Sequence, residues 1–170
     1  MRHIRLLGDP ILRRKAKEVE KIDENIKALV KDLFETMYAT DGIGLAAPQI
    51  GVPLRIFVMD DGTPKTFINP AIVFKSAETN IAEEGCLSVP EVFENVERSN
   101  EIVIRYTDLD GNEIEERLSG YSARVAQHEY DHLDGILFID LIPASRRFAI
   151  RQKLSNIIKQ SGKKYSTNKP

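Results

Sequence analysis

The sequence lacks the features of secreted and membrane-spanning proteins. Among its 170 residues there is one cysteine and no tryptophan, and a single cysteine excludes an intramolecular disulfide. No apolar run approaches the roughly 20 residues that a membrane span needs. The basic N-terminus, MRHIRLLGDPILRRKAK, has no apolar core followed by a cleavage site, so it is not a secretory signal. We therefore expect a cytoplasmic protein.

A surplus of charge of one sign is also absent. The chain has 24 Lys and Arg against 26 Asp and Glu, mixed along its length, for a net charge of −2. This balance predicts no broad basic surface for nucleic acid or an anionic membrane. The length and the 42% hydrophobic content suit one globular domain with its own core. We expect that domain over residues 1–160, followed by a polar, frayed tail at 161–170.

Two helices are predicted in the first part of the chain and around its middle. Apolar residues spaced three and four apart predict a helix over 24–39, with Asp23 at its N-cap. A second helix is expected over 120–133, capped by Ser119 or Ser122.

Strands are predicted between these helices, and a third helix follows them. Apolar, β-branched segments lie at 55–60, 66–70 and 71–77. Alternating residues on both sides of Asp110-Gly111 predict a hairpin over 101–120. The last helix is expected over 144–160. Helices at both ends and in the middle, separated by antiparallel strands, predict an α+β fold in which the sheets pack around the central helix.

The stretch QHEYDHLDG lies in the predicted central helix. Its His128 and His132 are four residues apart, so both imidazoles project from one helix face and can bind one metal ion. Glu129 follows the first histidine and can reach a water molecule on that ion without coordinating the metal. The alternative is a chance match to H-E-x-x-H on an exposed helix.

A catalytic metal held by two histidines needs a third protein ligand. After His132 the chain has no further His and no Glu, and its only carboxylates are Asp134 and Asp140. The candidate upstream is Cys86, in EEGCLSVP, because a thiolate with two imidazoles suits Zn²⁺ or Fe²⁺. The alternative is a buried, inert cysteine.

The third informative stretch is GIGLAAPQIG, residues 42–51. Its glycines and alanines allow the backbone to approach another group closely. Gln49 is the only side chain here with a strong hydrogen-bond donor. The glycine spacing matches neither a P-loop nor a dinucleotide-binding loop. The alternative is a tight turn that leads into the strand at 55.

Taken in order, GIGLAAPQ (42–49), EGCLS (84–88) and QHEYDH (127–132) resemble the three signature motifs of peptide deformylases. The GDPILRRKAK start, the INP segment and the hairpin agree as well, so the resemblance extends to about residue 160. It implies an enzyme that removes the N-formyl group from the N-terminal formylmethionine of new polypeptides and releases formate.

The resemblance also implies roles for individual residues. The metal ligands would be Cys86, His128 and His132. Glu129 would be the catalytic carboxylate, and the Gln49 side chain and the Leu87 N–H would stabilise negative charge on the formyl oxygen. The metal in much of the family is Fe²⁺, and Zn²⁺, Ni²⁺ or Co²⁺ can take its place. Cys86 would then be a ligand and not a nucleophile.

The sequence gives less evidence about the residues that would bind the substrate. Methionine needs an apolar slot, for which Ile43 and Val125 are the candidates; Val125 could equally be part of the core. An extended peptide could pair with the backbone near Ile43 and Gly44. Some family members have an arginine seven residues after the cysteine, where this chain has Phe93. Because of that difference, the sequence does not predict which residues contact the downstream part of the substrate.

Further interpretations concern neighbours and partners. Glu84 pairs with Arg98 or belongs to an unrelated surface pair. Asp131 accepts a hydrogen bond from a metal-bound histidine or lies on a solvated face, and Tyr130 and Leu133 are expected to pack. The expected partners are nascent formylmethionyl chains and, by the resemblance, the ribosome near its exit tunnel. We expect a monomer.

Two other functions compete with the deformylase interpretation. One is an H-E-x-x-H metallopeptidase that cleaves internal peptide bonds, but the downstream sequence lacks its third ligand. The other is non-catalytic: a metal-bound structural or ribosome-interaction module that kept the fold. The presence of both Glu129 and Gln49 argues against it, because neither is needed to hold a metal.

Overall fold

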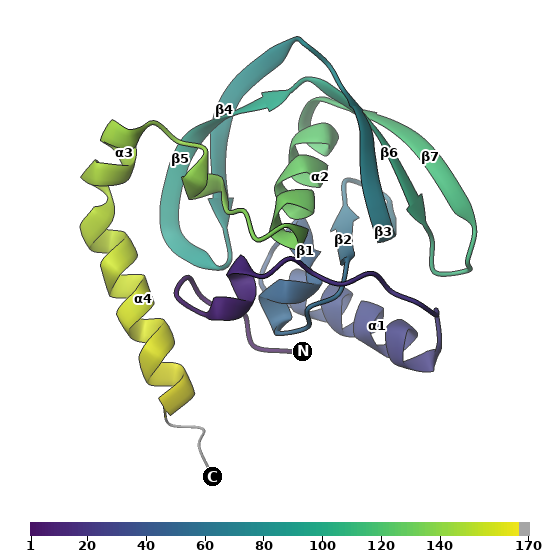
Figure 1. The fold of residues 1–170 in the computed structure, drawn as a ribbon, viewed down its shortest axis with the longest axis horizontal. Helices are drawn as coiled ribbons and strands as arrows, with labels where there is room; N and C mark the ends of the chain where they lie inside the picture. The colour runs from purple at the N-terminus through teal and green to yellow at the C-terminus, as the bar shows by residue number, and fades with distance from the viewer. Residues whose placement is uncertain (167–170) are drawn as a thin grey trace.

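The computed structural model describes residues 1–166 and has two antiparallel sheets. The larger has the strand order β1-β2-β3-β6-β7, and β4 and β5 form the smaller one. The strands are β1 (Gly44–Ala46), β2 (Ile56–Asp60), β3 (Pro64–Lys75), β4 (Thr79–Cys86), β5 (Val89–Ser99), β6 (Glu101–Thr107) and β7 (Glu113–Ser119). Helix α2 lies between the two sheets (Figure 1). The predicted α+β class and central helix are confirmed.

The first two predicted helices are confirmed at both ends. The helices are α1 (Glu24–Ala39), α2 (Gly120–Leu133), α3 (Ala144–Ala149) and α4 (Arg151–Ser166), with 3₁₀ turns at Pro10–Arg13, Ala47–Ile50 and Phe138–Asp140. Asp23 caps α1, accepting a hydrogen bond from the Ile26 N–H. Of the two serines expected to cap α2, Ser119 occupies the N-cap position. Ser119 precedes the helix without a side-chain cap bond, and the Ser122 hydroxyl donates to the Asp61 carboxylate.

The last predicted helix has different limits. The chain breaks at Ile150 into α3 and α4, and α4 continues to Ser166 instead of ending at 160. Ile150 is buried in the core formed by the C-terminal segment. Ser161 is also buried, and its hydroxyl donates to the Leu6 carbonyl, which gives the extra turn a tertiary contact. The predicted tail is therefore helical to Ser166, and its remaining residues lie outside the described part of the chain.

The hairpin over 101–120 is confirmed as β6 and β7, but two predicted strands are one. The segment at 66–70 and residues 71–75 of the segment at 71–77 belong to β3, whose register shifts between Ile68 and Ala71 and again between Ile72 and Phe74. Asn69 lies at the first of these shifts and has a left-handed backbone at φ +50°. Its side-chain amide pairs with both backbone groups of Val19, which offsets the lost ladder contact.

Strands β4 and β5 were not predicted as a pair. On the buried face of these strands lie charged residues, among them Glu84, Glu94 and Arg98. Alternation of apolar and polar residues is the sequence signal of a half-buried strand. Here the inward positions are themselves charged, so the signal is broken.

The large sheet is covered by helices on both faces. Along β2, successive side chains point to opposite faces, so Ile56 and Val58 pack with α1 while Phe57 and Met59 pack with α2. A third cluster joins α4, β5 and the N-terminal segment. Helix α2 is thus held by apolar contacts on its large-sheet side.

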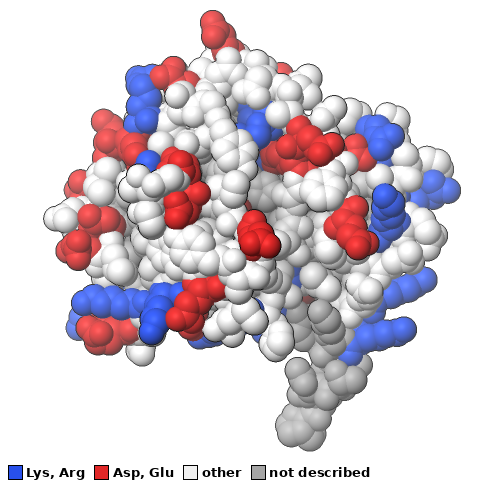
Figure 2. All heavy atoms as spheres, turned by 180° about the vertical axis from the view of Figure 1, so that it is seen from behind, with Lys and Arg blue, Asp and Glu red and all other residues white. Residues whose placement is uncertain are grey.

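The exposed charges do not form a single field. On the face shown in Figure 2, acidic and basic side chains are interspersed, consistent with the balanced composition. Within residues 1–166, none of the helices has the length and apolar character that crossing a membrane requires.

Candidate metal centre

Three side chains from the second and third motifs meet at one point. Cys86 is the last residue of β4, and His128 and His132 lie one turn apart on α2. One ligand atom from each lies within 4.8 Å of the others, and Cys86 Sγ is 3.4 Å from His132 Nε2. Among the side chains that the structure describes, this is the one cluster of His, Cys, Asp or Glu with such spacing. The predicted ligands are therefore brought together.

Glu84 orients the first histidine. Its Oε1 lies 2.8 Å from His128 Nδ1, which leaves Nε2 to face the cluster. Glu84 is in turn held by Arg98 through two hydrogen bonds of 2.9 and 3.0 Å, which confirms that predicted pair. Asp131 accepts from Arg98 at 2.6 Å and not from a histidine. The acceptor behind the His128 imidazole is thus Glu84 and not Asp131.

The three side chains fit a divalent metal ion. A thiolate and two imidazoles form a ligand set that Zn²⁺ and Fe²⁺ accept, and a catalytic site leaves a further position for water or substrate. Burial, together with the charge of His128, lowers the pKa of His132 well below its ordinary value, which favours the neutral imidazole. A ligand imidazole must be neutral. His132 Nδ1 is buried and has no hydrogen-bond partner among the described residues.

His128 responds to its neighbours in the opposite direction. Burial lowers its pKa, but hydrogen bonds to Cys86 and Glu84 raise it well above its ordinary value. A proton on His128 competes with a metal ion for the same nitrogen, so metal binding releases it.

Glu129 lies beside the cluster with its carboxylate buried. Its Oε2 has no hydrogen-bond partner among residues 1–166. Burial raises the pKa of its carboxyl to about 7, although the charge of His128 opposes this shift. Gly44 is the group that packs against Glu129, because a methyl group added at Gly44 would lie 2.8 Å from Glu129 Cγ. The predicted close approach of the first motif is confirmed.

The first motif also positions Gln49. Residues Gly44–Ala46 form edge strand β1, and the next four form a 3₁₀ turn that buries Gln49. The Ala46 N–H donates to Gln49 Oε1, so the amide nitrogen is directed outward. Gln49 Nε2 donates to Ser88 Oγ at 3.1 Å and lies 3.5 Å from Cys86 Sγ. A donor therefore faces the candidate metal site.

A cavity of about 550 Å³ opens next to these groups, within the range of small-molecule sites. Its wall includes the remaining predicted residues: Ile43, Gly44, Gln49, Leu87, Val125 and Glu129. Val125 both lines the cavity and packs against the core, so its two interpretations are not exclusive. Phe93 lines the cavity too, with its ring over Gly85 and 63% of its surface exposed.

Comparison with known proteins agrees with this geometry. Residues 1–148 match the family model described as polypeptide deformylase. The chain belongs to the peptide deformylase family.

Individual deformylases match nearly the whole chain. The peptide deformylase of Pseudothermotoga lettingae is 68% identical over 170 residues, covering 100% of this chain and 99% of the relative. The crystal structure of the deformylase of Thermus thermophilus superimposes with a TM-score of 0.90 at 42% identity, covering 95% of this chain and 99% of that one. The Thermotoga maritima structure gives 0.83 at 53% identity, covering 84% and 98%.

Peptide deformylases are metal-dependent hydrolases that remove the N-formyl group from nascent chains. One buried residue of this candidate site was missed by sequence reasoning. Arg124 lies on α2 four residues before His128 and donates to Glu84 Oε2 at 2.6 Å. The sequence signal that could have identified Arg124 is its spacing, because a residue four positions before His128 lies on the same helix face as the two histidines. On that face a solvent-exposed residue is not expected.

Proposed function

We propose that deformylation takes place in the cavity beside Cys86, His128 and His132, with Glu129 as the proton carrier. The observation that carries this assignment is the position of Glu129. Its buried carboxylate has one oxygen without a partner among the described residues, its other oxygen lies 3.9 Å from His128 Nε2, and the residue lines the cavity. A purely structural carboxylate in such a place would be expected to be hydrogen-bonded.

The ligand set would hold one divalent ion, which we propose is Fe²⁺ in the cell, with Zn²⁺, Ni²⁺ or Co²⁺ able to substitute. When bound, such an ion activates water as a nucleophile and polarises a carbonyl oxygen. Cys86 serves as a ligand, so no acyl-enzyme is formed on its sulfur.

Glu129 accepts a proton from the attacking water and later gives it to the departing amine. General acid–base groups work best with a pKa near the operating pH, and burial moves the pKa of the Glu129 carboxyl in that direction. The C–N bond between the formyl carbon and the methionine nitrogen breaks. The products are formate and a free α-amino group.

Gln49 and Leu87 are proposed to stabilise the formyl oxygen as it becomes negative. The Gln49 amide donates from a position next to Cys86, and Leu87 follows Cys86 along the chain, in the cavity wall. Donors placed in this way contribute most when the charge is fully developed, and losing one costs on the order of 10²–10³ in rate.

The substrate lies along the open edge of the large sheet in this proposal. Strand β1 is an edge strand, so an extended peptide can add to it near Ile43 and Gly44. Ile43 and Val125 then form the slot for the methionine side chain. Residues 1–160 are taken as one catalytic domain of a cytoplasmic monomer that meets nascent chains, including at the ribosomal exit tunnel.

The test is formate release from a formyl-Met tripeptide. The protein is purified without oxygen, and its metal content is measured before the assay. Glu129→Gln should keep its metal and lose at least about 10²-fold in kcat, the contribution of a positioned general base. Glu113→Gln is a matched control on the exposed end of β7 and should behave as wild type.

Two results would contradict the proposal. One is an unchanged kcat in Glu129→Gln. The other is internal cleavage of the peptide without formate, which would indicate a metallopeptidase.

A further inference from the structure

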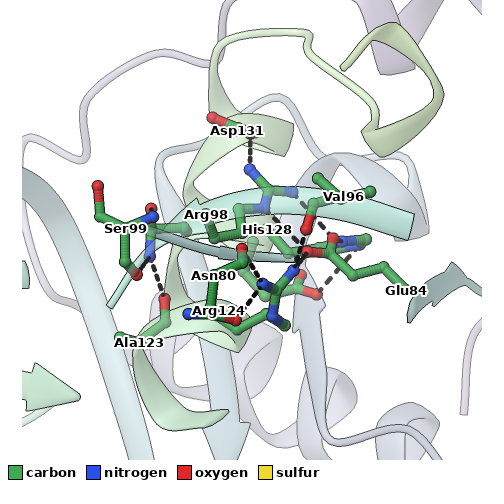
Figure 3. A network of polar contacts seen from close by, with 11 residues as sticks. Asn80, Glu84, Val96, Arg98, Ser99, Ala123, Arg124, His128 and Asp131 are labelled. Atoms are coloured by element: carbon green, nitrogen blue, oxygen red, sulfur yellow. Dashed lines mark hydrogen bonds and ion pairs between the residues drawn. The ribbon is translucent and has the colours of Figure 1, made fainter. Parts of the chain in front are cut away.

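Helix α2 has a polar stripe on the side that faces β4 and β5. Four residues spaced three and four apart form it and share one helix face, and each is hydrogen-bonded to the small sheet or its side chains: Arg124, Gln127, His128 and Asp131. Figure 3 shows this network, with the helix running alongside the strands. The apolar side of the same helix packs on the large sheet. The orientation of α2 toward the Cys86 strand is therefore set by hydrogen bonds.

Arg124 makes the most contacts within this stripe. It is 5% exposed. Its Nη1 donates to Glu84 Oε2 at 2.6 Å and to the Val96 carbonyl at 2.8 Å. Its Nη2 donates to the Asn80 carbonyl at 2.9 Å and to Asn80 Oδ1 at 2.6 Å. One side chain of α2 therefore binds both strands of the small sheet.

These contacts connect the elements that carry the metal ligands. Arg124 lies one turn before His128 on α2. On β4 it binds Asn80 and Glu84, and that strand ends at Cys86. Because the guanidinium is a planar fork with fixed donor directions, it restricts sliding of the strand along the helix.

Arg124 also balances charge behind the imidazole. The network contains two carboxylates, Glu84 and Asp131, and two guanidiniums, Arg98 and Arg124. Arg98 divides its donors between both carboxylates. Without Arg124 the network holds one more negative than positive charge, and one fewer donor fixes the Glu84 carboxylate. A buried carboxylate that loses a hydrogen-bond partner reorients toward the partners that remain.

We propose that Arg124 is a positioning residue of the metal centre. It holds Glu84 against His128 Nδ1 and fixes the Cys86 strand relative to the two histidines, so its removal weakens metal binding even where the fold is kept. The proposal rests on the metal site described above. The two are separable, because the wild-type protein tests the site and the variants test Arg124.

The experiment measures the dissociation constant of the metal by competition with a chelator, together with the visible spectrum of the Co²⁺ form. Arg124→Met should weaken metal binding by about 10–100-fold, the usual effect of removing a group behind a metal ligand. The Co²⁺ absorption should shift as the geometry at Cys86 relaxes. The thermal midpoint of the metal-free protein reports any general loss of stability.

Two milder variants keep the test decisive if Arg124→Met folds poorly. Arg124→Lys retains a cation for Glu84 but cannot reach Asn80 and Val96 as well, so its metal affinity should fall between those of wild type and Arg124→Met. Asn80→Ala removes one anchor at the far end of the network and should weaken metal binding in the same direction.

The matched control is Arg55→Met. Arg55 is another buried arginine, and it contacts the C-terminal end of α2. It donates to the Leu133 carbonyl and to Asp134. It has no bond to Glu84, so its loss should lower thermal stability with metal affinity within about twofold of wild type, as for independent sites. Equal weakening in Arg55→Met and Arg124→Met would overturn the proposal, because loosening of α2 would explain both.

A double substitution tests whether Arg124 acts through Glu84. In a Glu84→Gln background, Arg124→Met should reduce metal affinity by a smaller factor than it does in the wild-type background, because only its bonds to Asn80 and Val96 remain to be lost. A full additional loss contradicts action through Glu84. Unchanged metal affinity and Co²⁺ spectrum in all Arg124 variants, with wild type binding metal normally, would show a purely structural role.

Discussion

Gly44 packs against the side chain of Glu129, the candidate catalytic carboxylate, and leaves no room for a side chain of its own. A methyl group added at Gly44 would lie 2.8 Å from Glu129 Cγ and 3.1 Å from Cδ. Position 44 in the first motif must therefore lack a side chain, because Glu129 in the third motif occupies that space.

Gly44→Ala tests this contact. The added methyl group should displace Glu129, and a misplacement of about 1 Å at a reacting group costs on the order of 10²-fold in rate. We expect kcat to fall by that factor with metal content unchanged, measured by formate release and metal analysis. Gly162→Ala is the control, because nothing lies within 4 Å of its added methyl group. Wild-type kcat in Gly44→Ala would disprove the contact's role.

Metal removal and exchange form a second prediction. Chelation should abolish formate release, and adding back a divalent ion should restore it. A Cys86 thiolate beside Fe²⁺ is open to oxidation, so the iron form should lose activity in air faster than the nickel form. The measurement is residual activity against time in air for the two forms at equal loading. Equal decay would contradict the assignment of Cys86 as an iron ligand.

Gln49→Ala should lower kcat and leave KM nearly unchanged. The amide donor is aimed at the site by the Ala46 N–H and is needed only as charge develops, so the loss should be on the order of 10²–10³ in kcat. Steady-state kinetics on a formyl-Met tripeptide separates the two constants. The exposed Gln152 of α4, replaced by Ala, serves as control. A rise in KM alone would mean that Gln49 binds ground-state substrate.

Phe93 should influence the residues after the formylmethionine. It lines the cavity with most of its ring exposed, so Phe93→Ala should reduce kcat/KM about tenfold for peptides with large apolar downstream residues, as expected for a lost apolar contact. Peptides with alanine there should be affected less. Phe148 of α3 is 65% exposed and lies away from the cavity, which makes Phe148→Ala the control. A uniform loss across all peptides would contradict the prediction.

Acid stability should depend on Asp140. Burial alone would raise the pKa of its carboxyl, but hydrogen bonds from Arg13 and the Leu137 N–H lower it below the ordinary value of 3.8. Because the folded pKa is depressed, the stabilisation is present above the unfolded pKa and is lost as the pH falls through the folded value. Asp140→Asn should therefore lower the thermal midpoint at pH 7 and match wild type in strong acid. Calorimetry across pH tests this, and a gap that persists in strong acid would contradict it. Glu35→Gln, in an exposed pair with Lys31, is the control.

The parts of the fold that sequence reasoning predicted are those with a local signal. The helix over 24–39 has a regular apolar stripe and an Asp cap, and both were found. The three candidate ligands followed from helical spacing and from the absence of any downstream His or Glu. Glu129 and Gly44 could be placed in their motifs, but their contact joins two distant parts of the chain and needed the structure.

The missed parts depend on long-range charge pairing. Strands β4 and β5 bury Glu84, Glu94 and Arg98, and no local pattern separates a buried ion pair from an exposed one. Arg124 was missed for the same reason. Its four hydrogen bonds reach residues between 28 and 44 positions away in the chain.

The polar stripe of α2 has a consequence for transplanting this chemistry. Apolar packing tolerates small slips of a helix, whereas a fork of hydrogen bonds defines one position. Grafting H-E-x-x-H and a cysteine onto another helix–strand pair would reproduce the ligand types without their relative placement. A working graft would have to include all of the buried arginines and carboxylates of this network together with the three ligands.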